Sequence, residues 1–158
     1  MYLSRIIYAS RKLHGLAADE LGNILRSAEK NNRSLGITGM LCFNRKFFLQ
    51  VLEGRRTSIN QAYNRIVTDP RHEDVILVDY CRIERREFDN WAMGYVPEAG
   101  LTSELLLRYG GSADFNPLEM SPASVMGMMC ELRDSLRTVS TTIASGKTRV
   151  ATSAQAST

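Results

Sequence analysis

Apolar residues along the first hundred positions recur with two periods, one typical of strands and one typical of helices. Short apolar runs, rich in β-branched and aromatic residues, predict strands over residues 5–9, 37–43, 47–52, 75–80 and 91–96. Two sets of apolar residues fall on one face of a helix: Leu21, Ile24, Leu25 and Ala28, then Ile59, Tyr63, Ile66 and Val67. This order of elements predicts an α+β fold, a ferredoxin-like sandwich with a five-stranded sheet and two helices.

Polar positions set the limits of the two helices. The first is predicted over 17–31 and ends at the polar sequence Asn31-Asn32-Arg33-Ser34-Leu35-Gly36. The second is predicted to begin at a cap formed by Thr57 or Ser58. It stops before Asp69-Pro70, because proline disfavours helical backbone in the residue that precedes it.

The third predicted strand, which we expect Glu53-Gly54 to close, is apolar on both faces. Side chains alternate along a strand, so one face carries Phe48, Gln50 and Leu52 and the other carries Phe47, Leu49 and Val51. A strand of this kind is covered on both sides. We therefore expect the two helices on one face of the sheet and the C-terminal helices on the other.

The pattern changes beyond Pro97. Helices are predicted over 101–109 and from Ser121-Pro122 onward, the second with apolar residues at Val125, Met128, Met129 and Leu132. The methionines of this segment, Met126 included, either fill the core or form an adaptable interface with another subunit. The last residues are mostly Ser, Thr and Ala. We divide the chain into a domain over 1–97, a helical extension over 98–138 and a disordered tail over 139–158.

Composition and charge argue against several partners. The chain has 158 residues and a net charge of +3, with 20 basic and 17 acidic residues, and its basic clusters are short. This balance lacks the charge footprint of a nucleic-acid-binding protein. The N-terminus does not resemble a secretory signal, and no run reaches the about 18 apolar residues of a membrane span. We expect a cytoplasmic protein with no nucleic-acid and no membrane partner.

Cysteine and histidine usage argues against disulfide bonds and against a metal site. Cys42, Cys81 and Cys130 are odd in number and form no CxxC motif, so we expect reduced, buried thiols. The sequence contains two histidines, His14 and His72, too few for a metal site built on histidine. We expect no bound metal.

Candidate chemistry rests on three groups, because the GxSxG, GxxxxGK[ST], HExxH and GxGxxG motifs are all absent. Gln50 lies on an otherwise apolar strand, where its amide needs partners from the protein, from water or from a ligand. Tyr8 on the first strand is either a core residue or a functional one. Asn31 and Asn32 either cap the helix or offer two amides to a planar heterocycle. The predicted fold brings Tyr8, Asn32 and Gln50 together at a plausible pocket for a polar, aromatic ligand.

Several separated motifs follow one another in a specific order and spacing. They are Arg5-Ile6-Ile7-Tyr8-Ala9-Ser10, Asn31-Asn32, Gly36-Ile37-Thr38-Gly39-Met40-Leu41, Phe48-Leu49-Gln50-Val51-Leu52-Glu53-Gly54, Asp69-Pro70-Arg71-His72, Arg86-Glu87-Phe88 and Trp91-Ala92-Met93-Gly94. In this arrangement the chain resembles the BLUF family, sensors of blue light using FAD, over about residues 3–95. Its length and C-terminal helices resemble the short, stand-alone members. The resemblance implies non-covalent FAD in the domain over 1–97 and no enzymatic activity.

The resemblance also implies roles. The flavin ring would lie between the two helices, with Tyr8 as photochemical electron and proton donor and Gln50 as the bridge from Tyr8 to the flavin. Asn32 would bond the pyrimidine edge, with Asn31 beside it. Ring packing is implied for Ile24, Phe48 and Ile66, and places near the outer end of the flavin for Arg65, Asp69, Arg71 and His72. Trp91 and Met93 would carry the signal. Relatives can have serine where this chain has Ala28.

The implied output is a light-driven change in the hydrogen bonds of tyrosine, glutamine and flavin, read by a downstream signalling protein. Homo-oligomerisation through the C-terminal helices is also implied. One alternative is a light-independent flavin-binding protein or small flavoenzyme, for which His72 and some carboxylates are the available acid–base groups. Another is an RNA-binding module, for which Phe47 and Phe48 beside Arg45 and Lys46 give a weak pattern, because adjacent strand residues face opposite ways.

Overall fold

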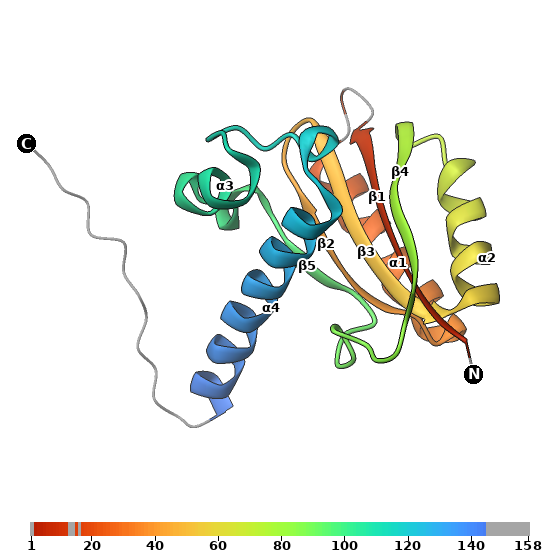
Figure 1. Ribbon diagram of the computed structural model, residues 1–158. Coiled ribbons are helices and arrows are strands. Elements are labelled where there is room, and N and C mark those ends of the chain that lie inside the picture. The colour runs from red at the N-terminus through yellow and green to blue at the C-terminus, as the bar shows by residue number, and fades with distance from the viewer. Residues whose placement is uncertain (1, 13–14, 16, 145–158) are drawn as a thin grey trace, which may run out of the picture.

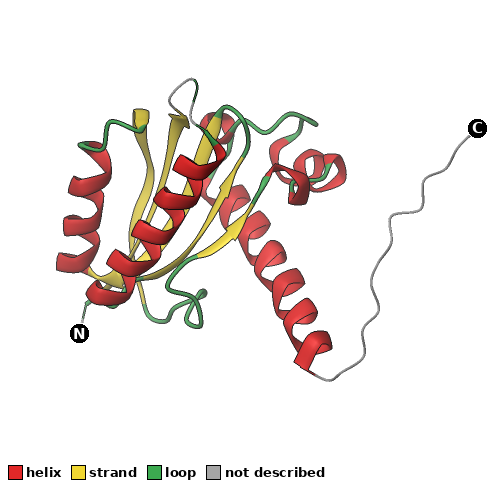
Figure 2. Cartoon of the chain, turned by 180° about the vertical axis from the view of Figure 1, so that it is seen from behind, coloured by secondary structure: helices red, strands yellow, loops and turns green. Residues whose placement is uncertain are grey.

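A computed structural model describes residues 2–12, 15 and 17–144 of the chain. Its sheet contains β1 (Leu3–Lys12), β2 (Thr38–Phe43), β3 (Phe47–Arg55), β4 (His72–Ile83) and β5 (Gly94–Val96), in the order β4-β1-β3-β2-β5. Neighbouring strands are antiparallel except β2 and β5, which are parallel. Helices α1 (Ala18–Leu35) and α2 (Arg56–Val67) cover one face, and α3 (Ser103–Gly110) and α4 (Pro122–Ala144) lie on the other (Figures 1 and 2). The predicted fold class and the two helical layers are confirmed.

Alternation along β3 divides the core into two layers. Phe48 and Leu52 pack with apolar residues of α1 and α2, whereas Leu49 and Val51 belong to the larger cluster shared with α3 and α4. Met128 and Met129 are fully buried in that larger cluster, and Met126 is partly buried against it. The core-filling interpretation of these methionines is therefore the correct one for Met128 and Met129.

Helix α1 runs four residues beyond its predicted end at Asn31. It stops at Gly36, whose φ of 64° is the left-handed conformation that glycine adopts without strain. The prediction was wrong because asparagine was taken as the stop signal. The Asn32 amide instead bonds the backbone oxygen of Ala92 and so does not compete with the helix, while Arg33 pairs with Glu29 one turn earlier.

The boundaries of β1, β3, α2 and β4 also differ from prediction. β1 is longer than the predicted strand over 5–9 and continues through Lys12. β3 continues through Glu53 and Gly54, because these residues pair with Arg5 and Ser4 of β1. α2 begins at Arg56 and makes no side-chain cap, so neither Thr57 nor Ser58 caps it. β4 is also longer than the predicted 75–80 run and forms an edge of the sheet.

The fifth strand is shorter than the predicted 91–96. Only Gly94–Val96 pairs with β2, because the backbone before it bonds elsewhere. The Trp91 N–H donates to Phe88 and the Trp91 oxygen accepts from Gly39, at 3.3 and 3.0 Å. The Ala92 oxygen accepts from Asn32. This irregular segment therefore contacts both α1 and the start of β2.

The C-terminal extension ends in a long helix. α4 continues to Ala144, so its last residues fall within the predicted tail that starts at Val139, and residues 145–158 lie outside the described chain. Among the described residues, no helix combines the length and hydropathy needed to cross a membrane.

Candidate functional site

A cleft between α1 and α2, above β1 and β3, collects nearly all of the predicted site residues. Its lining includes Tyr8, Ile24, Asn31, Asn32, Phe48, Gln50, Arg65, Ile66, Asp69, Arg71, His72 and Met93. Trp91 is the exception among the predicted residues. The fold therefore gathers around one site side chains from β1, α1, β3, α2 and β4, from the turn between α2 and β4, and from the segment before β5.

Tyr8 and Gln50 form the buried floor of the cleft. They are directly opposite one another on the antiparallel strands β1 and β3, and they are 2% and 4% exposed. The Tyr8 hydroxyl donates to Gln50 Oε1, and Gln50 Nε2 donates to Met93 Sδ at 3.2 Å. Burial, with smaller contributions from Asp69 and Tyr63, raises the pKa of Tyr8 far above its usual value. The phenol is therefore protonated and its proton has a defined acceptor.

The last turns of α1 supply two amides to the cleft. Asn32 is 5% exposed, and its Nδ2 donates to the Ala92 oxygen at 2.9 Å. Asn31 is half-buried and lies one residue earlier on the same wall. Because Asn32 contacts the segment before β5 and Gln50 contacts Met93 in that segment, the two amides share one neighbour.

Charged groups lie together at one end of the cleft. Arg71 Nε and Nη2 donate to the Asp69 carboxylate at 2.9 and 2.6 Å, and these bonds lower the pKa of Asp69. His72 Nδ1 lies 2.7 Å from Ser10 Oγ, and its ring centroid lies 4.9 Å from that of Phe48. Arg65 is exposed at the surface of α2. The inner part of the cleft is thus neutral and the outer part charged.

His72 makes stability depend on pH in a defined window. Burial lowers the pKa of His72 below its ordinary 6.5, so between the two pKa values the unfolded chain binds a proton that the folded chain does not. The contribution of His72 to folding stability is fully present above pH 6.5 and is lost as the pH falls below that value. Asp69 has its effect at more acidic pH. Its pKa is lowered in the folded chain, so its contribution to folding stability is lost only as the pH falls below the ordinary value of 3.8.

We therefore expect urea unfolding midpoints to be lower at pH 5 than at pH 8 for the native chain. The difference should shrink in His72→Gln. An unchanged difference in that variant would show that other groups set the pH dependence.

The structure separates the two residues predicted to carry a signal. Met93 lines the cleft, whereas Trp91 packs against the core on the opposite face of the sheet, with the Arg137 guanidinium 5.7 Å from its ring centroid. Sequence reasoning missed Ser27, Leu41 and Ala62, which also line the cleft. Two of them had a signal: Ser27 is one helical turn before Asn31, and Leu41 is paired with Gln50 across the β2–β3 hairpin.

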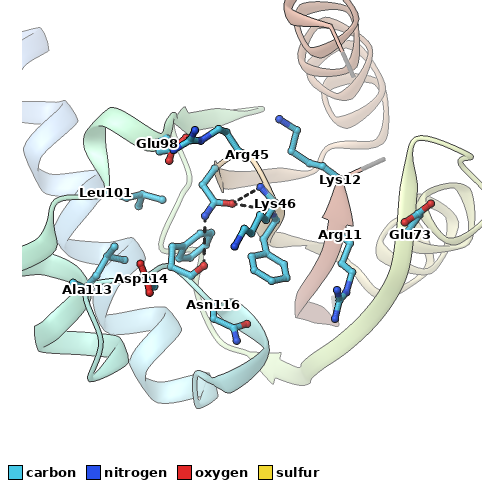
Figure 3. Close-up of a pocket in the computed structure, with 14 residues that line it drawn as sticks. Arg11, Lys12, Arg45, Lys46, Glu73, Glu98, Leu101, Ala113, Asp114 and Asn116 are labelled. Atoms are coloured by element: carbon cyan, nitrogen blue, oxygen red, sulfur yellow. Dashed lines mark hydrogen bonds and ion pairs between the residues drawn. The ribbon is translucent and has the colours of Figure 1, made fainter. Parts of the chain in front are cut away.

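A second and larger hollow, of about 990 Å³, contains none of the predicted site residues. It lies between the turn joining β2 and β3 and the C-terminal extension (Figure 3). Two of its arginines are in ion pairs: Arg45 pairs with Glu98 of the same lining at 3.5 Å, and Arg11 pairs at 3.3 Å with Asp74, which lies outside the lining. Asn44 bonds its own turn and the Phe115 oxygen. We assign no ligand to it.

The three cysteines are less buried than expected, because only one of them is fully buried. Cys42, Cys81 and Cys130 are free, with Cys42 buried and the other two partly buried. Across the described residues there is no group of three or more His, Cys, Asp and Glu side chains that could hold a metal ion.

Residues 3–94 match the family model described as sensors of blue light using FAD. The chain is 31% identical over 118 residues to the photoactivated adenylate cyclase subunit beta of Euglena longa, and it covers only 12% of that protein. It is also 31% identical over 85 residues to the blue light- and temperature-regulated antirepressor BluF of Escherichia coli K12, covering 21% of it. The family that covers more than half of this chain is described as a sensor, and the chain spans only a small part of these two relatives.

Solved structures give the same assignment over more of the chain. BlsA in its photo-activated state has a TM-score of 0.75 and 27% identity, with 82% of this chain and 94% of BlsA covered. The dark-state structure of BlrB, a BLUF protein, has a TM-score of 0.71 and 26% identity, with 85% and 96% covered. The likeness therefore extends into the C-terminal helices.

The donor set of the cleft fits a flavin. A flavin ring presents carbonyl oxygens and ring nitrogens along one edge, and the amides of Gln50, Asn31 and Asn32 supply both donors and acceptors. Aromatic and aliphatic side chains, Phe48, Ile24 and Ile66, line the same space. The cleft encloses about 80 Å³, less than the about 300–1,000 Å³ of typical ligand pockets, so ring binding requires its walls to part. From the family match, the shared fold and the paired Tyr8 and Gln50, the chain belongs to the BLUF family of blue-light sensors, whose cofactor is FAD.

Proposed function

We propose that Tyr8 and Gln50 form the photochemical pair of this sensor, and that light changes the hydrogen bonds of Gln50. The observation that carries the proposal is the buried chain of bonds from the Tyr8 hydroxyl to Gln50 Oε1 and from Gln50 Nε2 to Met93 Sδ. One amide links the phenol to the segment before β5. Any rearrangement of that amide therefore changes the hydrogen bonds of both Tyr8 and Met93.

The remaining cleft residues bind the cofactor in this proposal. Asn32 and Asn31 bond the pyrimidine edge of the flavin, since they place two amides on one wall of the cleft. The ring packs against Ile24, Phe48 and Ile66. The charged outer end, with Arg65, Asp69, Arg71 and His72, lies along the remainder of the cofactor.

Bound FAD supplies the absorption of blue light and, when excited, a strong oxidant. Tyr8 is the residue placed to give up an electron, and its phenolic proton then passes to the Oε1 of Gln50, the acceptor that it already faces. When the electron and proton return, the amide can settle turned by half a rotation. Gln50 Nε2 then faces the Tyr8 oxygen, and Oε1 faces the sulfur of Met93, which has no proton to donate.

In this proposal the bond from Gln50 Nε2 to Met93 Sδ is lost in the light, and a partner protein binds differently to the chain as a result. We propose that the partner is a downstream signalling protein in the cytoplasm, in line with the free cysteines of the chain. Homo-oligomerisation through the C-terminal helices stays a prediction. The apolar face of α4 around Val125, Met128 and Met129 is buried in the core, so a second copy would contact other surface.

Absorption of the purified protein in the dark and after blue light tests this function. We expect a flavin spectrum that shifts slightly to the red on illumination and recovers in the dark, because the new amide orientation changes the hydrogen bonds to the flavin. A bound flavin that is indifferent to light would favour the alternative, a light-independent flavin-binding protein or small flavoenzyme.

A further inference from the structure

Glu53 is a buried carboxylate that the proposed photochemistry does not use. It is fully buried on β3, on the sheet face opposite Gln50, and its Oε1 accepts from Arg5 Nε and Nη2 at 2.9 and 2.7 Å. Its Oε2 accepts from the backbone N–H groups of Glu87 and Phe88 at 2.8 and 3.1 Å. One side chain thus fixes two consecutive backbone positions of the segment before β5.

A buried ion pair is weak evidence for stability, because the cost of removing both charges from water offsets most of their attraction. An apolar pair of similar size could fill the same space. The Glu53 carboxylate supplies what an apolar side chain cannot, an acceptor for two backbone N–H groups that would otherwise lose this bond. The pair therefore serves to position the chain at 87–88.

Helix α4 holds the same position from the other side. Arg133, whose side chain is 13% exposed, donates from Nη1 to the Glu87 backbone oxygen at 3.1 Å and to the Glu87 carboxylate at 2.9 Å. Its guanidinium carbon lies 5.9 Å from the centroid of the fully buried Phe88 ring. Glu87 is thus bonded to β3 through its N–H and to α4 through its oxygens.

The far end of this segment reaches the photochemical pair. The Phe88 oxygen accepts from the Trp91 N–H, Ala92 accepts from Asn32, and Met93 accepts from Gln50. Met93, whose sulfur faces the Gln50 amide, lies only five positions after Phe88, which Glu53 fixes. Displacing Met93 therefore strains a short stretch that is held at its start.

We propose that Glu53 and Arg133 are positioning residues for the photochemical pair: they anchor the backbone at 87–88 and thereby hold Met93 against Gln50. The inference rests on the proposed function, because it assumes that light turns the Gln50 amide. With the amide turned, Oε1 and Sδ are two acceptors facing each other, so Met93 must move. The anchor opposes this movement and disfavours the lit state, and loosening it prolongs that state.

Arg133→Met is the deciding variant, since it removes the bonds to Glu87 without touching the cleft. We expect the lit state to recover in the dark about five-fold more slowly or slower still, the lower end of typical coupling between sites. Arg133→Lys keeps a charge that can bond one Glu87 oxygen, so its recovery time should lie between those of Arg133→Met and the native chain. Glu53→Gln probes the anchor directly and should act in the same direction.

Arg108→Met is the matched control. Arg108 is an exposed arginine of α3 that pairs with Glu131 of α4 at 2.5 Å and with Glu104, not with the segment 87–93. Its loss weakens the packing of the extension and should leave the recovery time unchanged. The variants are compared by recovery of visible absorption and by thermal unfolding of the full chain with its flavin bound.

The outcomes separate the two proposals. A native chain that does not shift on illumination contradicts the proposed function. A native chain that shifts, together with an Arg133→Met recovery less than twice as long as the native one, contradicts the anchor alone. Equal slowing in Arg133→Met and Arg108→Met also contradicts it, because general loosening of the extension would then explain the effect.

Discussion

Tyr8→Phe should abolish the light-induced spectral shift while leaving the flavin bound. The ring that fills the core beside α2 remains, and only the phenolic hydroxyl is lost. That hydroxyl donates to Gln50 Oε1, so its removal takes away both the readily oxidised phenol and the proton that Gln50 accepts. The loss of one buried hydrogen bond should cost only about 1–3 kcal/mol, which leaves the domain folded.

The measurement is the difference between spectra before and after blue light, at equal flavin content. Tyr63→Phe is the matched control, because the Tyr63 ring lies 6.4 Å from that of Tyr8 on α2 and is only partly buried. It should shift as the native chain does. Gln50→Leu should fail to shift for the complementary reason, since it keeps the phenol and removes its acceptor. A normal shift in Tyr8→Phe would exclude Tyr8 as the donor.

Gly39→Ala should destabilise the domain more than any surface substitution. A Cβ added at Gly39 would lie 2.1 Å from the Val51 backbone oxygen and 3.2 Å from the Leu52 Cα. Neither atom can move away, because β3 is bonded to β1 on one side and to β2 on the other. Gly39 also donates its N–H to Trp91. We expect a loss of at least about 3 kcal/mol, the upper range for overpacked cores.

Thermal unfolding followed by circular dichroism measures this loss, which corresponds to a fall in Tm of about 6–12 °C. Gly110→Ala is the control. Gly110 ends α3, has nothing within 4 Å of its added Cβ, and has no left-handed φ, so alanine there should be neutral or slightly stabilising. Equal Tm values for the two variants would mean that the β2–β3 pair can separate at little cost.

Local patterns in the sequence were sufficient for the fold and for the floor of the site. Alternation along 47–52 placed Gln50 on the same sheet face as Phe48 and Leu52, and the order of elements brought the strands of Tyr8 and Gln50 together. Both features depend on periods of two and about four residues, which are visible in any short window. The helices and strands that they predict are those observed.

Boundaries set by distant partners could not be predicted in the same way. The local sequence at Asn32 predicts the end of a helix, but the Asn32 amide donates to the backbone oxygen of Ala92, 60 residues away. The local sequence at Trp91 predicts a strand, but the Trp91 backbone oxygen accepts from the N–H of Gly39. The roles of Arg65, Asp69 and Arg71 likewise came from resemblance to a family. Nothing in their local pattern distinguishes them from ordinary surface residues.

The two-faced β3 has a consequence for how such a sensor can diversify. Its successive residues serve different tasks, since Gln50 belongs to the cofactor face and Leu49 and Val51 to the core beneath α4. Residues of the cofactor face and of the face that packs against α4 therefore alternate along β3, although the two faces lie on opposite sides of the sheet. A different helix or domain can therefore be fitted by repacking the side chains of one sheet face, provided that it keeps the bonds that Arg133 of α4 makes to Glu87. We expect such an exchange to leave Gln50 and its neighbours on the cofactor face in place.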